Sequence, residues 1–200
     1  MLKVGITGGI GCGKSTVAQV FASYGIPCFI CDSVAAAYYS DAAFCQQMVS
    51  LLGGSVVKSD GTISKRAVAD IIFADEDKMK AVNELIHPKV MRDFERWCQQ
   101  WVQSPYVLFE SAILYEYGLD SQMDAVVAVH AGIGERVERL RLRDKATVAQ
   151  IEAIINAQMA SEEKMQRADY VILNYEGNPR ERQVEHVHHL LLHRATGLTP

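Results

Sequence analysis

The chain has 200 residues, 49% of them hydrophobic, which is enough to bury the core of one domain with insertions or small appended subdomains. Its 20 basic and 24 acidic side chains give a net charge of −4 with no block of lysines and arginines, which argues against a nucleic-acid partner. No apolar run approaches the ~20 residues needed to cross a bilayer, and the N-terminal apolar stretch is too short for a signal peptide. The composition therefore favours small-molecule chemistry without a membrane partner.

The cysteines indicate the redox compartment. Their number is odd and their spacing matches no zinc site, although Cys28 and Cys31 have the CxxC form within a strand-like run. Reduced thiols in a cytoplasmic protein are the simplest interpretation.

The first predicted strand, at residues 3–7, leads into a phosphate-binding motif. Residues 8–15 satisfy G-x-x-x-x-G-K-[ST], in which glycines allow backbone N–H groups to wrap closely around phosphate oxygens. We expect Lys14 to bind the β and γ phosphates, and Ser15 to offer its hydroxyl to Mg²⁺. A helix predicted at 15–24 would point its N-terminus at the anion. The residues expected to bind the nucleotide are Gly8, Gly9, Gly11, Cys12, Gly13, Lys14, Ser15 and Thr16.

Four more strand-like segments follow, at residues 28–31, 106–110, 125–130 and 170–174. They are short and apolar, and helical patterns separate them, which predicts a parallel sheet covered by helices on both faces. The predicted fold class is therefore α/β: a three-layer α/β/α sandwich with a mainly parallel five-stranded sheet. Ligands of such folds gather at the carboxyl ends of the strands.

Asp32 directly follows the second predicted strand. A carboxylate at this edge could take the proton of a substrate hydroxyl as a general base in phosphoryl transfer. Aspartate is also favoured as the N-cap of a helix, and a helix is expected from Ser33. The residues alone leave both interpretations open.

The long interval 33–104 predicts several helices, at residues 41–52, 64–73, 75–85 and 88–103. Pro88 suits the first turn of the last of these, where its missing N–H costs least. As a lone histidine, His87 is more often structural than catalytic. We interpret the interval as a helical insertion.

Residues 134–167 are also predicted to be helical and are a candidate lid. Arg136, Arg139 and Arg143 share one helix face, from which they could neutralise charge on the γ phosphoryl group. The alternative is a solvated face paired with Glu135 and Glu138.

Two carboxylates bracket the end of the third strand. Glu110 and Glu116 could hold Mg²⁺ through water or orient a substrate, or either could be a surface charge. Four histidines near the C-terminus, at positions 186, 188, 189 and 193, lack accompanying carboxylates or cysteines, so we interpret them as a polar helix surface.

Together these motifs resemble the dephospho-coenzyme A kinases. The family's opening G-[IL]-T-G-G-I-G-x-G-K-S matches residues 5–15, and further landmarks follow in the same order through most of the chain. These landmarks are Asp60 to Arg66, Ile86-His87-Pro88, Ile113 to Glu116, Gln158, Lys164, Ala168-Asp169 and Asn174.

This resemblance implies transfer of the ATP γ-phosphoryl group to the ribose 3′-hydroxyl of dephospho-coenzyme A, with Mg²⁺ as cofactor. It implies a nucleotide-binding core of residues 1–32, 105–133 and 168–200, a substrate region at 33–104 and a lid at 134–167. The partners would be ATP and dephospho-coenzyme A, and the protein a monomer or small homo-oligomer.

The resemblance also implies roles for particular residues. It makes Asp32 the catalytic base, as the second aspartate of the family's D-x-D. Lys14, Arg139 and Arg143 would be catalytic, while His87, Glu116 and Lys65 would bind the substrate together with Asp32. Three positions depart from the family pattern: Ile30 replaces the first aspartate, Ala112 a proline and Arg136 a glutamine.

Two other functions remain as alternatives. Another small P-loop kinase would share the loop and lid but use a different acceptor pocket. A GTP-dependent switch would normally carry N-K-x-D and a well-placed D-x-x-G, neither of which the chain has.

Overall fold

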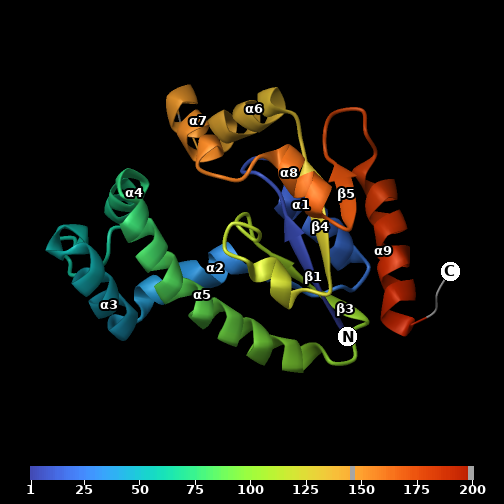
Figure 1. Cartoon of the computed structure of the whole chain (residues 1–200), viewed down its shortest axis with the longest axis horizontal. Helices are drawn as coiled ribbons and strands as arrows, with labels where there is room; N and C mark the ends of the chain where they lie inside the picture. Colours follow the sequence, from blue (N-terminus) through green and yellow to red (C-terminus); the bar gives the residue numbers. More distant parts are fainter. Residues whose placement is uncertain (145–146, 198–200) are drawn as a thin grey trace. The chain divides into compact units, whose positions relative to one another are not determined.

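The computed structural model describes residues 1–144 and 147–197 (Figure 1). The chain forms two compact units, one comprising Met1–Ile30 and the chain from Gln100 onwards, the other Cys31–Gln99. The predicted boundaries of core and lid include residues 145–146 and 198–200, which lie outside the described residues. Among the helices of the described part, none is long and apolar enough to span a membrane.

The first unit is built on a five-stranded parallel sheet in the order β2-β3-β1-β4-β5. The strands are β1 (Leu2–Thr7), β2 (Cys28–Ile30), β3 (Tyr106–Glu110), β4 (Ala125–His130) and β5 (Tyr170–Leu173). The predicted α/β fold with a five-stranded parallel sheet is thus confirmed. Because β1 lies at the centre, the loop that follows it opens at the edge of the sheet where α/β proteins bind ligands.

Apolar side chains cover both faces of this sheet. On one face, Val17 of α1 (Lys14–Ser23) and Val184 of α9 (Arg180–Thr196) belong to the same buried cluster as the β1 residues Val4 and Ile6. On the other face, Gly5 leaves room for the segment after β3: a Cβ there would lie 2.6 Å from Leu114 Cδ2. Burial on both faces explains why the strands read as continuous apolar runs.

The described residues of the segment predicted as a lid form helices that belong to the first unit (Figure 1). They are α6 (Ile133–Asp144), α7 (Val148–Asn156) and α8 (Ser161–Arg167). Thr147 caps α7 in a capping box with Gln150, which satisfies backbone donors at the start of that helix. A short 3₁₀ turn, η4 (Leu119–Gln122), precedes β4.

The second unit is helical. Its helices are α2 (Cys31–Ala37), α3 (Ala42–Leu52), α4 (Lys65–Ala74) and α5 (Glu76–Cys98), with 3₁₀ turns η1 (Tyr38–Ser40) and η2 (Gly54–Val56). Phe44, Met48, Val68 and Val82 are buried together in its core. The side chain of Asp41 caps α3, as Ser64 and Asp75 cap α4 and α5. These caps explain why the predicted boundaries of α3 and α4 are close to those observed.

The prediction that Pro88 begins a helix is wrong. Pro88 lies inside α5, which runs without a break from the segment predicted at 75–85 into the segment predicted at 88–103 and ends at Cys98. A proline within a helix removes one hydrogen bond and costs about 3 kcal/mol. Val82, Val90 and Phe94, on both sides of the proline, are buried, and their packing outweighs this local cost.

Candidate active site

The phosphate loop joins β1 to α1, and its glycines are required by both conformation and space. Gly11 and Gly13 have φ angles of 80° and 86°, which L side chains rarely adopt. A Cβ on Gly13 would also lie 2.1 Å from Asn174 Nδ2. No side chain caps α1, so N–H groups of its first turn remain available to an anion.

Lys14 places a buried positive charge on this loop. Its side chain folds back so that Nζ donates to the Gly8 carbonyl at 3.1 Å, and the residue is only 8% exposed. Within the described part of the chain, no carboxylate lies within 4.0 Å of the ammonium. A buried cation held only by neutral carbonyls is incompletely compensated, and a polyphosphate would supply the missing negative charge.

Ser15 lies beside the carboxylate of Glu110. The Ser15 hydroxyl donates to Glu110 Oε1 at 3.1 Å, and the β1–β3 register places Glu110, buried at the end of β3, opposite Ile6. Magnesium prefers oxygen ligands and is usually held by one or two carboxylates together with substrate phosphates. This pair therefore fits a Mg²⁺ site that a nucleotide would complete. Among the residues described, no group of three or more His, Cys, Asp or Glu could hold a metal by itself.

The neighbouring Cys28 is an inert thiol. Burial, together with the charge of Glu110, raises its pKa to about 12, so the sulfur stays protonated at neutral pH. Within the described residues all five cysteines are free, as expected from their number and spacing.

Two side chains from outside the loop hold its second half. Arg139 of α6 donates from Nη1 to the carbonyls of Gly11 and Cys12, at 3.3 and 3.4 Å, and from Nη2 to the Asn174 carbonyl at 2.9 Å. Asn174, directly after β5, donates from Nδ2 to the Cys12 carbonyl at 2.8 Å. The guanidinium of Arg139 therefore lies at the phosphate loop, although it also pairs with Glu135 at 3.8 Å.

Arg136, one turn earlier on α6, is buried against the first half of the loop. Its Nε donates to the Ile10 carbonyl at 2.9 Å, and its Nη1 donates to Ser161 Oγ at 3.1 Å. Burial lowers the pKa of this guanidinium from its ordinary value. The alternative of a solvated arginine face is thus wrong for Arg136, which is 6% exposed.

Glu116 forms a buried ion pair. Lys164 of α8, which is fully buried, donates from Nζ to Glu116 Oε1 at 2.7 Å and to the Ala112 carbonyl at 2.6 Å. Glu116 Oε1 also accepts from the Met159 N–H at 3.0 Å. This pair joins the segment after β3 to α8. Burial lowers the pKa of Lys164, and the carboxylate partly opposes that effect.

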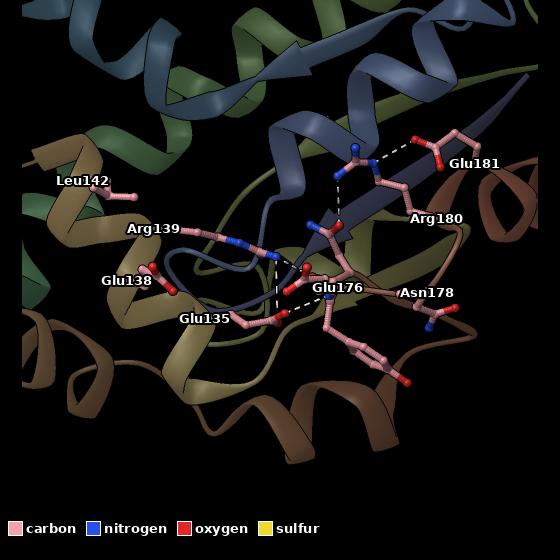
Figure 2. Close-up of a pocket in the computed structure, with 11 residues that line it drawn as sticks. Glu135, Glu138, Arg139, Leu142, Glu176, Asn178, Arg180 and Glu181 are labelled. Carbon is pink, nitrogen blue, oxygen red and sulfur yellow. Dashed lines mark hydrogen bonds and ion pairs between the residues drawn. The ribbon is translucent and has the colours of Figure 1, made fainter.

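A cavity of about 410 Å³ opens beside the second half of the phosphate loop. Figure 2 shows Glu135 and Arg139 of α6 facing the loop that carries Glu176 and Asn178, with Arg180 of α9 nearby. The Glu176 N–H donates to Glu135 Oε1 at 2.8 Å. The volume suits a small-molecule ligand, and charged groups of both signs line the walls.

Arg143 does not join Arg136 and Arg139 at the loop. Its side chain is exposed and forms a bidentate pair with its neighbour Asp144, at 2.7 and 2.8 Å. Arg143, seven residues after Arg136, therefore lies beyond the part of α6 that contacts the loop.

Three predicted site residues belong to the helical unit. Asp32 is exposed in the first turn of α2, which begins at Cys31, so the alternative in which it caps a helix starting at Ser33 is wrong. Lys65 begins α4 and lies 5.2 Å from the centre of the Tyr39 ring. His87 lies within α5, and burial lowers its pKa.

Reasoning from the residues alone missed the contacts of Arg136, Gln158, Lys164 and Asn174. The helical spacing of the arginines signalled one shared face, but not that this face covers the phosphate loop. The other three positions were marked only by the resemblance, and their contacts join residues far apart in the sequence.

Known proteins resemble this chain in sequence along most of its length. The sequence model of the dephospho-CoA kinase family matches residues 2–179. A dephospho-CoA kinase of Bacteroides fragilis (strain YCH46) is 37% identical over 173 residues, covering 86% of this chain and 84% of that protein.

Solved structures agree as well. A crystal structure from Thermus thermophilus aligns with a TM-score of 0.82 and 31% identity, over 100% of this chain and 98% of that one. The dephospho-CoA kinase from Campylobacter jejuni has a TM-score of 0.64 and 20% identity, with 98% of each chain covered, and so supports the fold alone. The family's sequence pattern thus extends over the phosphate loop, the strands and the arginine-bearing helix described above, and the chain belongs to the dephospho-CoA kinase family.

Proposed function

We propose that this chain transfers the γ-phosphoryl group of ATP to the ribose 3′-hydroxyl of dephospho-coenzyme A, yielding coenzyme A and ADP. The observation that carries the proposal is the uncapped N-terminus of α1 beside the buried ammonium of Lys14, which together form a site for polyphosphate. Family membership supplies the acceptor.

The nucleotide occupies the first unit in this proposal. The phosphates lie in the loop formed by residues 8–16, with Lys14 released from the Gly8 carbonyl to bind the β and γ phosphates. The adenine base occupies the cavity beside Arg139 and Asn174, because both of these lining residues donate to the Cys12 carbonyl of the loop. Mg²⁺, when bound by Ser15 and Glu110, would neutralise charge on the phosphates.

Several side chains would act on the transferring group and the acceptor. Asp32 takes the proton of the attacking 3′-hydroxyl and orients it. Arg139 and Arg143 stabilise the charge on the γ phosphoryl group, which requires Arg143 to leave Asp144. His87, Lys65 and Glu116 contribute to acceptor binding. We place residues 33–104 in the acceptor site and residues 134–167 in the lid, which would also exclude water.

The reaction belongs in a reducing compartment, since the free cysteines require no oxidising one. We therefore propose a cytoplasmic enzyme.

The test is ADP release from Mg²⁺-ATP in the presence of dephospho-coenzyme A, AMP, CMP, dTMP or shikimate, or without acceptor, with each product identified by mass. We expect release only with dephospho-coenzyme A, which gains one phosphoryl group. Turnover on another acceptor alone would instead identify a different small-molecule P-loop kinase.

Lys14→Ala is the control for the nucleotide site. It removes the ammonium that would bind the phosphates, so ATP binding and turnover should both fall. A fully active Lys14→Ala protein would contradict the role assigned to the loop.

A further inference from the structure

Ile10, at the outer edge of the phosphate loop, has both backbone groups held by distant side chains. Its N–H donates to Gln158 Oε1 at 2.9 Å, and its carbonyl accepts from Arg136 Nε at 2.9 Å. Gln158 follows α7 and Arg136 lies on α6, so both contacts come from the segment after β4. The peptide groups of Ile10 are therefore turned towards this segment rather than towards the phosphates.

Arg136 joins three parts of the first unit. While Nε holds Ile10, Nη1 donates to Ser161 Oγ at the start of α8 at 3.1 Å. Nη2 lies against Gly9, where a Cβ would approach it to 2.3 Å. The loop can thus pass close to the guanidinium only because position 9 is glycine.

The charge of Arg136 has no acidic partner in contact. Across residues 1–144 and 147–197, no carboxylate lies within 4.0 Å of its guanidinium, and the residue is 6% exposed. Lys164, the other buried cation of this region, differs because Glu116 neutralises it. The more distant Glu162 carboxylate favours the charged guanidinium but does not offset the effect of burial. The negative charge of a bound polyphosphate would offset the remaining cost in free energy.

We propose that Arg136 is a positioning residue for the nucleotide: it holds Gly9 and Ile10 in the conformation that receives the phosphates and places a buried positive charge next to them. The inference rests on the proposed function in taking a nucleoside triphosphate as the ligand. The dephospho-coenzyme A kinases that this chain resembles carry glutamine at this position. Compared with glutamine, arginine adds a second hydrogen-bond donor group and a positive charge. Arg136 therefore sets nucleotide affinity, through the loop that it holds and through its charge, and does not touch the transferring group.

Steady-state kinetics of Arg136→Met test this role, with Arg141→Met as the matched control. Arg141 lies on the same helix but is exposed. Losing hydrogen bonds from a charged donor should raise the KM for ATP about tenfold or more. The KM for dephospho-coenzyme A should not change, and kcat should stay within about threefold, because the reacting groups are untouched. Arg141→Met should match the wild type in all three parameters.

Amide hydrogen exchange of the ligand-free protein tests the structural half of the proposal without requiring any activity. Arg136→Met should speed exchange in the peptide covering residues 8–13, and Arg141→Met should not. Arg136→Gln, which can still donate one hydrogen bond to Ile10, should give an intermediate KM for ATP. It also keeps the test usable if the methionine variant does not fold.

Two results would overturn the inference. An unchanged KM for ATP with a lowered melting temperature would make Arg136 a purely structural residue. A large fall in kcat at unchanged KM would mean that it contacts the transferring group. Failure of the proposed function would look different, because the wild type itself would then neither bind ATP nor phosphorylate dephospho-coenzyme A.

Discussion

Lys14, Arg136 and Lys164 are buried cations of the first unit, and their partners distinguish them. Lys164 has the carboxylate of Glu116, whereas Lys14 and Arg136 are held by neutral oxygens. Charges that are buried without a counter-ion are retained where a ligand provides it. At the scale of single residues, the first unit is therefore prepared for an anion before any anion binds. The acidic residue proposed as the base, Asp32, is by contrast exposed.

Replacing Asp32 with asparagine tests the proposed base. The amide cannot accept the proton of the attacking hydroxyl, so kcat should fall by roughly 100-fold or more. ATP affinity should change little, because we assign the nucleotide to other residues. Steady-state kinetics and an ATP-binding titration measure the two effects.

The matched control is Asp70→Asn, the same change at an exposed aspartate of α4. This variant should behave as the wild type. Turnover of Asp32→Asn equal to that of Asp70→Asn would remove Asp32 from the mechanism.

At the scale of elements, side chains from the segment after β4 connect α6 to the phosphate loop and α8 to the segment after β3. Lys164 of α8 is bonded to Glu116 and to the Ala112 carbonyl, both in the segment after β3. Ala112 stands where the family pattern has a proline, and Lys164 uses its backbone oxygen, which either residue would provide. This departure therefore leaves the contact intact.

Lys164→Met should destabilise the protein strongly, because it leaves the Glu116 carboxylate without its cation. Breaking a buried ion pair from one side typically costs about 3–5 kcal/mol of unfolding free energy. The double variant Lys164→Met/Glu116→Leu should recover much of this loss, since it removes the isolated charge. Urea unfolding followed by circular dichroism measures both.

Lys80→Met provides the comparison, because Lys80 and Glu84 form an exposed pair whose side chains are 75% and 68% accessible. It should change stability by less than about 1 kcal/mol. If Lys164→Met were no worse than Lys80→Met, the buried pair would contribute little to the fold.

At the scale of the whole molecule, the sequence predicted those features that short stretches of residues determine. The motif at residues 8–15 located the phosphate loop, and short apolar runs located all five strands. Pro88 was misplaced because burial of Val82, Val90 and Phe94 outweighs its local preference.

Long-range contacts were beyond the reach of local patterns. Helical periodicity put Arg136 and Arg139 on one face, but no local pattern could show that Ile10 and Cys12 lie opposite them. The histidines of α9 also show that local patterns do not reveal long-range contacts. His188 was expected on a polar surface but is buried, with Nδ1 2.7 Å from the hydroxyl oxygen of Tyr106.

His188 should make stability depend on pH. Burial and the neighbouring His189 lower its pKa, and the Tyr24 ring stacks on it at 4.7 Å. The unfolded chain therefore binds a proton at a higher pH than the folded one, so the free energy of unfolding falls as pH drops below about 6.5. One such group contributes at most about 1.4 kcal/mol per pH unit.

His188→Gln removes the titrating group and keeps a polar partner for Tyr106. Its unfolding free energy should fall less than that of the wild type when the pH is lowered from about 7.5 to about 5.5, on either side of the ordinary histidine pKa. The exposed His193→Gln should keep the wild-type dependence. Equal pH dependence in all three proteins would show that His188 titrates alike in the folded and unfolded chain.

The proposed reaction phosphorylates one particular hydroxyl, the ribose 3′-hydroxyl of dephospho-coenzyme A. The most direct measurement compares two acceptor analogues, one lacking the 2′-hydroxyl and one lacking the 3′-hydroxyl of that ribose, by ATP-dependent gain of a phosphoryl group in mass spectrometry. We predict that the 2′-deoxy analogue is phosphorylated and the 3′-deoxy analogue is not. Phosphorylation of the 3′-deoxy analogue, or of neither analogue while dephospho-coenzyme A itself is left unmodified, would contradict the claim.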